Sequence, residues 1–136
     1  MAGKSNYLEG AFLNHLLRTT ALTQPTNVYV GLYTAAPTDA GGGTEVTGNG
    51  YARAAISRAD ASWSAPAGTP RATANAATVT FSPNPSATWG VVTHFGIFDA
   101  LTTGNLLYWA ALGTSKTINS GDVVSFAAAA ISITED

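Results

Sequence analysis

The chain has 136 residues, no cysteine and a formal net charge of −2. This length allows one hydrophobic core of ordinary size, so we expect a single domain over residues 1–136. The absence of cysteine excludes disulfides and zinc sites built on thiolates. The slightly acidic balance offers no basic surface to phosphates, which argues against nucleic acid as a partner.

Charged residues make up only 10% of the chain, whereas soluble domains usually carry about a quarter. The surface must therefore be unusually neutral, which suits a surface that lies against other protein. A compositional habit of the source organism would give the same bias and stays an alternative. The apolar run near the start is interrupted by Glu9, Asn14 and His15, and no later run approaches the roughly 20 residues of a membrane-spanning helix. We therefore predict neither a signal peptide nor a membrane partner.

The segment SNYLEGAFLNHLLR predicts the one clear helix of the chain, over about residues 6–18. Asn6 can cap the start of this helix, and Glu9 three residues later completes a capping-box pattern. Gly10 weakens the helix modestly. The helix is followed by the segment TTALTQPT, after which the hydrophobic pattern changes.

The apolar residues of this helix spread over a wide arc. At 100° per residue, the side chains that share one side are Leu8, Phe12, His15 and Leu16. Leu13 and Leu17 lie well round from Leu8, so the arc is wider than one sheet face requires. Either the helix is sandwiched within its own subunit, or one stripe contacts a neighbour. We favour the second interpretation and predict that Leu13 and Leu17 contact another subunit or another layer.

From residue 27 onward the sequence alternates with the period of two that strands show. The predicted strands are residues 27–34, 51–59, 76–81, 90–98, 105–112 and 122–134. The segments between them are rich in glycine, proline and asparagine, which favour turns. One early helix followed by six or seven strands without a helical crossover indicates an antiparallel sandwich or barrel. We predict a jelly-roll-like antiparallel β-sandwich with one N-terminal α-helix.

The predicted hairpin THFGIFDALTTGNLLYWAAL carries large side chains on both faces. Because alternate residues of a strand point to opposite faces, only one set can fill the core. The set expected in the core is Phe95, Ile97, Leu107 and Trp109. The set expected under the helix or at a subunit contact is Phe98, Leu106 and Tyr108. On the strand before it, Tyr29 and Tyr33 alternate with aliphatic residues, and we add both tyrosines to the interface candidates.

No group of residues forms a catalytic or metal-binding pattern. His94 and Asp99 could join a serine or threonine in a triad, but no G-x-S-x-G motif accompanies them. His15 and His94 are the only histidines, which is too few for a zinc site without cysteine. The aspartates that lie in or near loops, without a D-x-D-x-D run to gather them for calcium, are Asp39, Asp60 and Asp122. We predict no enzyme, no catalytic, cofactor or metal site, and no small-molecule substrate.

Three stretches resemble a family of small virion proteins of tailed bacteriophages that often carry the label phage tail fibre protein. They are residues 4–53, WGVVTHFGIFDALTTGNLLYWAAL and INSGDVVSFAAAAISI. The resemblance covers nearly the whole chain and departs mainly over residues 60–75. It implies a non-enzymatic structural protein of the virion that is made in the host bacterial cytoplasm and contacts other virion proteins.

The place of the chain in the virion is a separate question. Fibres are usually long trimers of extended or repeated segments, whereas this chain has no internal repeat, heptad or collagen-like period. A small, weakly charged β block suits a capsid decoration or cement protein that bridges major capsid subunits, and we favour that role, with homo-oligomer formation. The alternative is a tail fibre or tail-tip protein involved in host adsorption.

Overall fold

The computed structural model describes residues 3–135. Its main sheet is antiparallel, with the strand order β1-β8-β7-β2-β3, and β4 also pairs with β2. The strands of this sheet are β1 (Gly3–Lys4), β2 (Asn27–Ala35), β3 (Thr44–Glu45), β4 (Ala54–Ser57), β7 (Gly90–Phe98) and β8 (Leu106–Ile118). The other elements are α1 (Asn6–Leu17), the 3-10 turn η1 (Asp60–Ser62), β5 (Arg71–Ala74), β6 (Val79–Thr80), β9 (Ser125–Phe126) and β10 (Ser132–Glu135).

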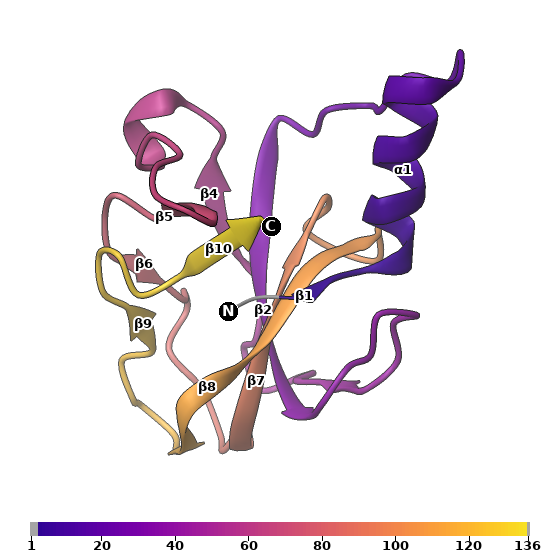
Figure 1. Cartoon of the computed structure of the whole chain (residues 1–136). Helices are drawn as coiled ribbons and strands as arrows, with labels where there is room; N and C mark the ends of the chain where they lie inside the picture. Colours follow the sequence, from indigo (N-terminus) through magenta and orange to yellow (C-terminus); the bar gives the residue numbers. More distant parts are fainter. Residues whose placement is uncertain (1–2, 136) are drawn as a thin grey trace.

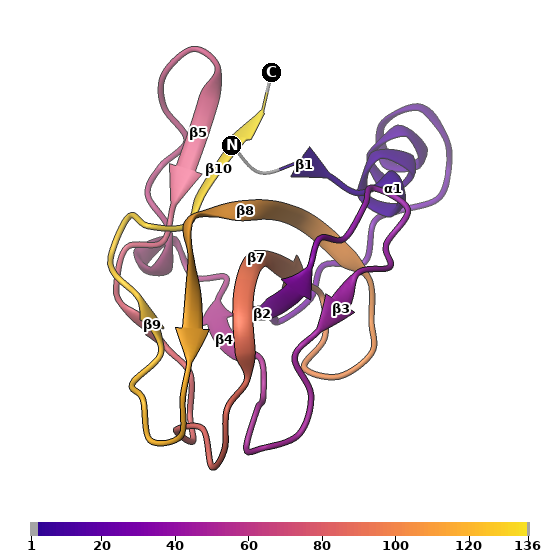
Figure 2. The ribbon, with the colours of Figure 1, turned by 90° about the horizontal axis from the view of Figure 1, so that it is seen from below.

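The elements outside the main sheet lie on two opposite sides of the molecule. The antiparallel pairs β5–β10 and β6–β9 gather on one side, whereas α1 stands on the other (Figures 1 and 2). The predicted class is confirmed, because the described residues form a mainly β structure of antiparallel sheets with one α-helix and no closed barrel. The jelly-roll order of the strands stays a prediction.

Strand prediction succeeded where the alternation is long. β7 has the predicted bounds, and β2 is one residue longer than predicted. The predicted strand 122–134 is instead divided into β9 and β10, and Ala129 between them has a positive φ of 62°. The predicted strands at 51–59 and 76–81 shrink to β4 and β6, and the short strands β1, β3 and β5 were not predicted. Two to four residues are too few to show a period.

The helix begins one residue earlier than its predicted cap. Ser5, not Asn6, is the N-cap, because its Oγ accepts a hydrogen bond from the Leu8 amide at 3.2 Å. The same hydroxyl donates to the Leu106 carbonyl and is 2% exposed. The amide of Asn6 donates instead to the Asp39 carbonyl at 2.8 Å. Ser5 therefore fixes the start of α1 to β8.

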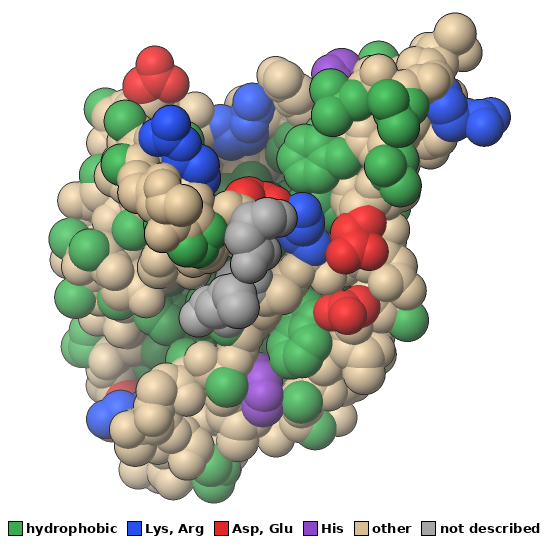
Figure 3. Space-filling model, viewed as in Figure 1, with side chains coloured by type: hydrophobic (Ala, Val, Ile, Leu, Met, Phe, Trp, Pro, Cys, Tyr) green, Lys and Arg blue, Asp and Glu red, His purple; other side chains and the backbone are tan. Residues whose placement is uncertain are grey.

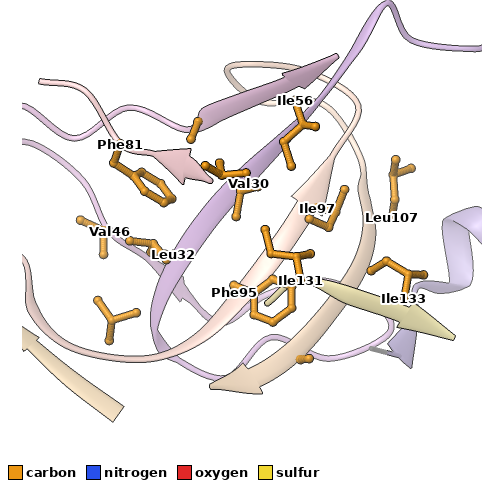
Figure 4. Packing of buried hydrophobic residues seen from close by; sticks show 14 of the residues in the cluster. Val30, Leu32, Val46, Ile56, Phe81, Phe95, Ile97, Leu107, Ile131 and Ile133 are labelled. Atoms are coloured by element: carbon orange, nitrogen blue, oxygen red, sulfur yellow. The ribbon is translucent and has the colours of Figure 1, made fainter. Parts of the chain in front are cut away.

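The main core lies between the main sheet and the two short strand pairs. Val30 and Leu32 of β2 belong to one cluster with Phe95 of β7 and with Phe81 and Ile131 from the opposite side (Figure 4). Ile131 and Val30 are completely buried. The helix joins the same cluster through Leu8, which is 4% exposed, and through the half-buried Phe12.

The hairpin of β7 and β8 places its two hydrophobic sets almost as predicted. Phe95, Ile97 and Leu107 are buried in the main core, which confirms that part of the prediction. The placement of Trp109 in the core is wrong, because this residue packs against a second cluster on the outer face of the sheet. Tyr108 was predicted on the outer face and packs against the main core instead.

A β-bulge explains the exchange of Tyr108 and Trp109. Tyr108 pairs with Ile97, but Leu106, two residues earlier in β8, pairs with Phe98, the very next residue of β7. Leu107 is thus an extra residue in β8, and a bulge shifts the alternation of a strand by one position. Unbroken alternation, on which the prediction rested, therefore fails from Tyr108 onward.

Candidate interaction surface

Three leucines of α1 form the most prominent apolar surface of the described residues. Leu13, Leu16 and Leu17 are 59%, 74% and 78% exposed, and we call them the leucine face. Hydrophobic side chains gather over α1 in the space-filling view (Figure 3). Leu16 was predicted to share the covered side with Leu8, but it stays open because α1 contacts the body mainly through its first two turns. Contact of Leu13 and Leu17 with another subunit stays a prediction.

The leucine face lies between two opposite charges. Glu9 is exposed in the first turn of α1, and the exposed Arg18 follows its last turn. Within residues 3–135, neither side chain forms an ion pair or a hydrogen bond. Other charged groups are engaged: Lys4 pairs with Glu135, and Arg53 pairs with Glu45. Glu9 and Arg18 are thus available to a partner.

The outer cluster of the main sheet is covered by the chain itself. It consists of Tyr33, Phe98 and Leu106, with Tyr29 and Trp109 packed against them. Tyr33, Phe98 and Leu106 are 4%, 5% and 8% exposed, so these three interface candidates need no neighbour to leave water. Tyr29 is half-buried at the margin of the cluster. Subunit contacts through these residues stay predictions.

Arg53 is the side chain that covers Phe98. Its guanidinium carbon lies 3.4 Å from the centroid of the Phe98 ring, a cation–π contact. Its Nε and Nη2 donate to the two carboxylate oxygens of Glu45 at 2.8 and 2.7 Å. Its Nη1 donates to the carbonyls of Ala100 and Thr103 at 2.8 and 2.7 Å. One residue therefore holds β3, β4, the end of β7 and the 99–105 turn together.

Tyr51 extends this network toward the main core. Its hydroxyl donates to Glu45 Oε1 at 2.8 Å and accepts from the Leu32 amide at 2.9 Å. The tyrosine ring makes an edge contact with Trp89 at 5.2 Å between centroids. Sequence reasoning found no role for Arg53, Glu45 or Tyr51, because nothing in their spacing shows that three loops meet there.

Three buried tyrosines should make the fold sensitive to alkali. Burial raises the pKa of Tyr33 from 10.0 to about 12, and burial also raises the pKa values of Tyr51 and Tyr108. Above about pH 10 the unfolded chain loses tyrosine protons that the folded chain keeps, so protons favour the folded state. We expect the free energy of unfolding to be constant below pH 10 and to fall as the pH rises toward 12. Urea unfolding followed by circular dichroism across this range measures it, and an unchanged value at about pH 11 would contradict the expectation.

The residues considered for chemistry have structural partners. The Asp99 carboxylate accepts from the amide and the side-chain Nδ2 of Asn105 at 2.6 and 2.7 Å. His94 Nδ1 lies 2.8 Å from Thr93 Oγ1, and His15 Nδ1 accepts from the Leu22 amide at 3.2 Å. No group of three or more potential metal ligands occurs within residues 3–135.

The loop aspartates are likewise separate from one another in function. Asp39 accepts from Trp109 Nε1 at 2.9 Å, and Asp122 accepts from the Asn119 amide at 2.8 Å. Asp60 begins η1. Two of these three carboxylates thus hold neighbouring groups of the chain in place.

The largest hollow lies at the far end of the main sheet from α1. It has a volume of about 550 Å³, and its lining includes Phe95, Leu112, Lys116, Val124 and Phe126. Four of these five side chains are apolar, and Lys116 is the one charge of the whole lining. The hollow offers an apolar depression but no converging set of polar groups, which a specific small-molecule site requires.

The comparisons with known proteins agree with this picture of packing without a reactive centre. A family model described as podophage GP4 fiber I protein gp80 matches residues 3–134. The match makes the chain a bacteriophage structural protein, which works in the virion together with other virion proteins. The chain belongs to the gp80 family of podophage GP4 fiber I proteins. None of the curated proteins compared with the chain matches it. No helix among residues 3–135 is long and apolar enough to cross a membrane.

Proposed function

We propose that the chain is a building block of a virion fibre that takes part in host adsorption, and that it has no catalytic activity. The family match over residues 3–134 carries the proposal, because the description of that family names a fibre protein. The shape of the chain supports assembly from repeated copies, since a block with one exposed apolar helix face can be joined to others. We also propose that it is made in the host cytoplasm and joins the virion on assembly.

A capsid decoration protein is the second candidate, and one observation favours it. The described chain is a block of packed sheets without the extended or repeated segments from which long fibres are built. A decoration protein would stabilise the head through many weak contacts that add up across the shell. The two candidates differ in what the virion loses when the chain is absent.

Virions assembled without the chain test the two candidates in one experiment. A fibre role predicts that such particles keep normal heads but adsorb to host cells at least about tenfold more slowly, because many fibre contacts act together. Adsorption is measured as the loss of free virions, and head stability as the temperature of DNA release. Supplying the parent chain in trans should restore adsorption. Normal adsorption with DNA release at a lower temperature would favour the decoration role and contradict the fibre role.

The absence of catalysis has a separate test. The purified chain should not cleave ester, peptide or glycan substrates, because His94 and Asp99 hold different neighbours. Hydrolysis that disappears in His94→Ala would overturn this part of the proposal.

A further inference from the structure

We propose that two copies of the chain pair through the leucine face, with their α1 helices antiparallel across a two-fold axis beside Leu13. The inference goes beyond the fibre role and does not depend on it. Its first basis is exposure: Leu13, Leu16 and Leu17 are all more than half exposed on a twelve-residue helix. A contiguous exposed apolar surface on an otherwise well-packed chain marks an interaction site.

Charge complementarity selects a second copy as the occupant. Glu9 and Arg18 lie at opposite ends of the leucine face, and neither has a partner within residues 3–135. They are nine residues apart, or about 13 Å along a helix, which is too far for a pair within one chain. In an antiparallel pair each Glu9 lies against the Arg18 of the other copy. A parallel pair would instead bring like charges together, so complementarity fixes the direction.

The position of Gly10 gives the pairing a register. If Glu9 of one copy faces Arg18 of the other, Leu17 faces Gly10 and the two Leu13 side chains meet at the axis. A side chain built on Gly10 would meet no atom within 4 Å, so packing within the chain does not require glycine there. Glycine inside a helix costs roughly 0.5–1 kcal/mol relative to alanine. In the dimer its missing side chain leaves room for Leu17 of the partner, as ridges fit grooves between packed helices.

The strength of the pairing follows from its size. Three leucines and two ion pairs make a contact smaller than the roughly 800 Å² per partner of standard stable interfaces. We therefore expect a reversible dimer that dissociates on dilution. In an assembly that holds several copies together, the same contact gains from the high local concentration.

Sedimentation equilibrium of the purified full chain tests the pairing directly. We expect a shift from monomer to dimer as the concentration rises to about 1 mM. Leu13→Asp should weaken the dimer by at least about tenfold, whereas Val123→Asp, at a side chain that is 73% exposed elsewhere, should leave it unchanged. Both variants should melt at the temperature of the parent chain, because both side chains are exposed in the monomer. A chain that stays monomeric throughout, or equal effects of the two variants, would overturn the proposal.

Charge reversal tests the antiparallel direction. Glu9→Arg and Arg18→Glu should each weaken self-association, because each places two like charges face to face. A mixture of the two variants should form heterodimers as strong as the parent dimer, since each Glu then faces an Arg again. The double variant Glu9→Arg/Arg18→Glu should also recover the parent affinity. If mixing restores nothing, the two charges do not meet and the proposed direction is wrong.

Cysteine cross-linking tests the position of the axis in a chain that has no cysteine of its own. Leu13→Cys should form a disulfide with the same residue of the second copy, because bridged Cα atoms must lie within about 7 Å. Glu9→Cys alone should not cross-link, whereas a mixture of Glu9→Cys with Arg18→Cys should. Cross-linking of Glu9→Cys with itself as efficiently as Leu13→Cys would indicate a parallel pair and overturn the two-fold arrangement. These results are independent of the adsorption experiment, so either proposal can fail alone.

Discussion

Replacing Arg53 with alanine should lower the free energy of unfolding by about 3–5 kcal/mol, the usual cost of removing one member of a buried ion pair. The Arg53 side chain is 8% exposed, and its partner Glu45 is 23% exposed. The substitution leaves the Glu45 carboxylate and the carbonyls of Ala100 and Thr103 without their donor. It also uncovers one face of the Phe98 ring. Urea unfolding of the purified chain measures the loss.

Arg58→Ala is the matched control for this prediction. Arg58 also donates to a carbonyl, that of Pro25 at 2.8 Å, but it does so from an exposed position. We expect that variant to lose no more than about 1 kcal/mol. Arg53→Lys should fall between the two, because an ammonium keeps the charge but cannot bind a carboxylate through two parallel hydrogen bonds. Equal stabilities of Arg53→Ala and Arg58→Ala would show that the network around Arg53 does not hold the fold.

Replacing Asn75 with alanine should cost about 3 kcal/mol or more, because several buried backbone groups lose their partners at once. Asn75 is 2% exposed. Its Oδ1 accepts from the Ile131 amide at 2.8 Å, and its Nδ2 donates to the carbonyls of Ala77 and Ala127 at 2.8 and 2.9 Å. This one amide joins the end of β5 to the segment between β9 and β10.

The control for Asn75 is Asn84→Ala. The Asn84 side chain is exposed and forms no hydrogen bond within residues 3–135, so its loss should change stability by less than about 0.5 kcal/mol. Asn75→Asp should be as harmful as Asn75→Ala, since a carboxylate keeps the acceptor but faces two carbonyl oxygens without a proton to donate. A stable Asn75→Asp variant at neutral pH would contradict this account.

The sequence predicted the elements whose signal is local. The period of two marks β2 and β7, and the apolar run marks α1. The wheel of α1 also separated Leu13 and Leu17 from Leu8, which the structure buries. Each of these features depends on residues close together in the chain, and a periodic pattern can express that.

The remaining features depend on residues that are distant in sequence. The bulge at Leu107 results from the pairing with β7, and it reversed the expected places of Tyr108 and Trp109. Arg53 reaches the carbonyl of Thr103 across 50 positions of the chain, and Asn75 reaches Ile131 across 56. Single polar residues such as these leave no pattern, because their role is set by the loops that the fold brings to them.

The ion pair between Lys4 and Glu135 has a practical consequence for labelling. Their side chains meet at 2.6 Å, and Tyr108 donates to the same carboxylate at 2.7 Å. Partial burial alone would raise the pKa of the Glu135 carboxyl, but the hydrogen bonds from Lys4 and Tyr108 outweigh it and lower that pKa. The first and last strands therefore end beside each other, joined by a contact that persists in mild acid. A fluorescent dye or affinity tag placed before β1 and one placed after β10 would leave the body at the same spot, so a matched pair of tagged chains would report on a single surface of the molecule.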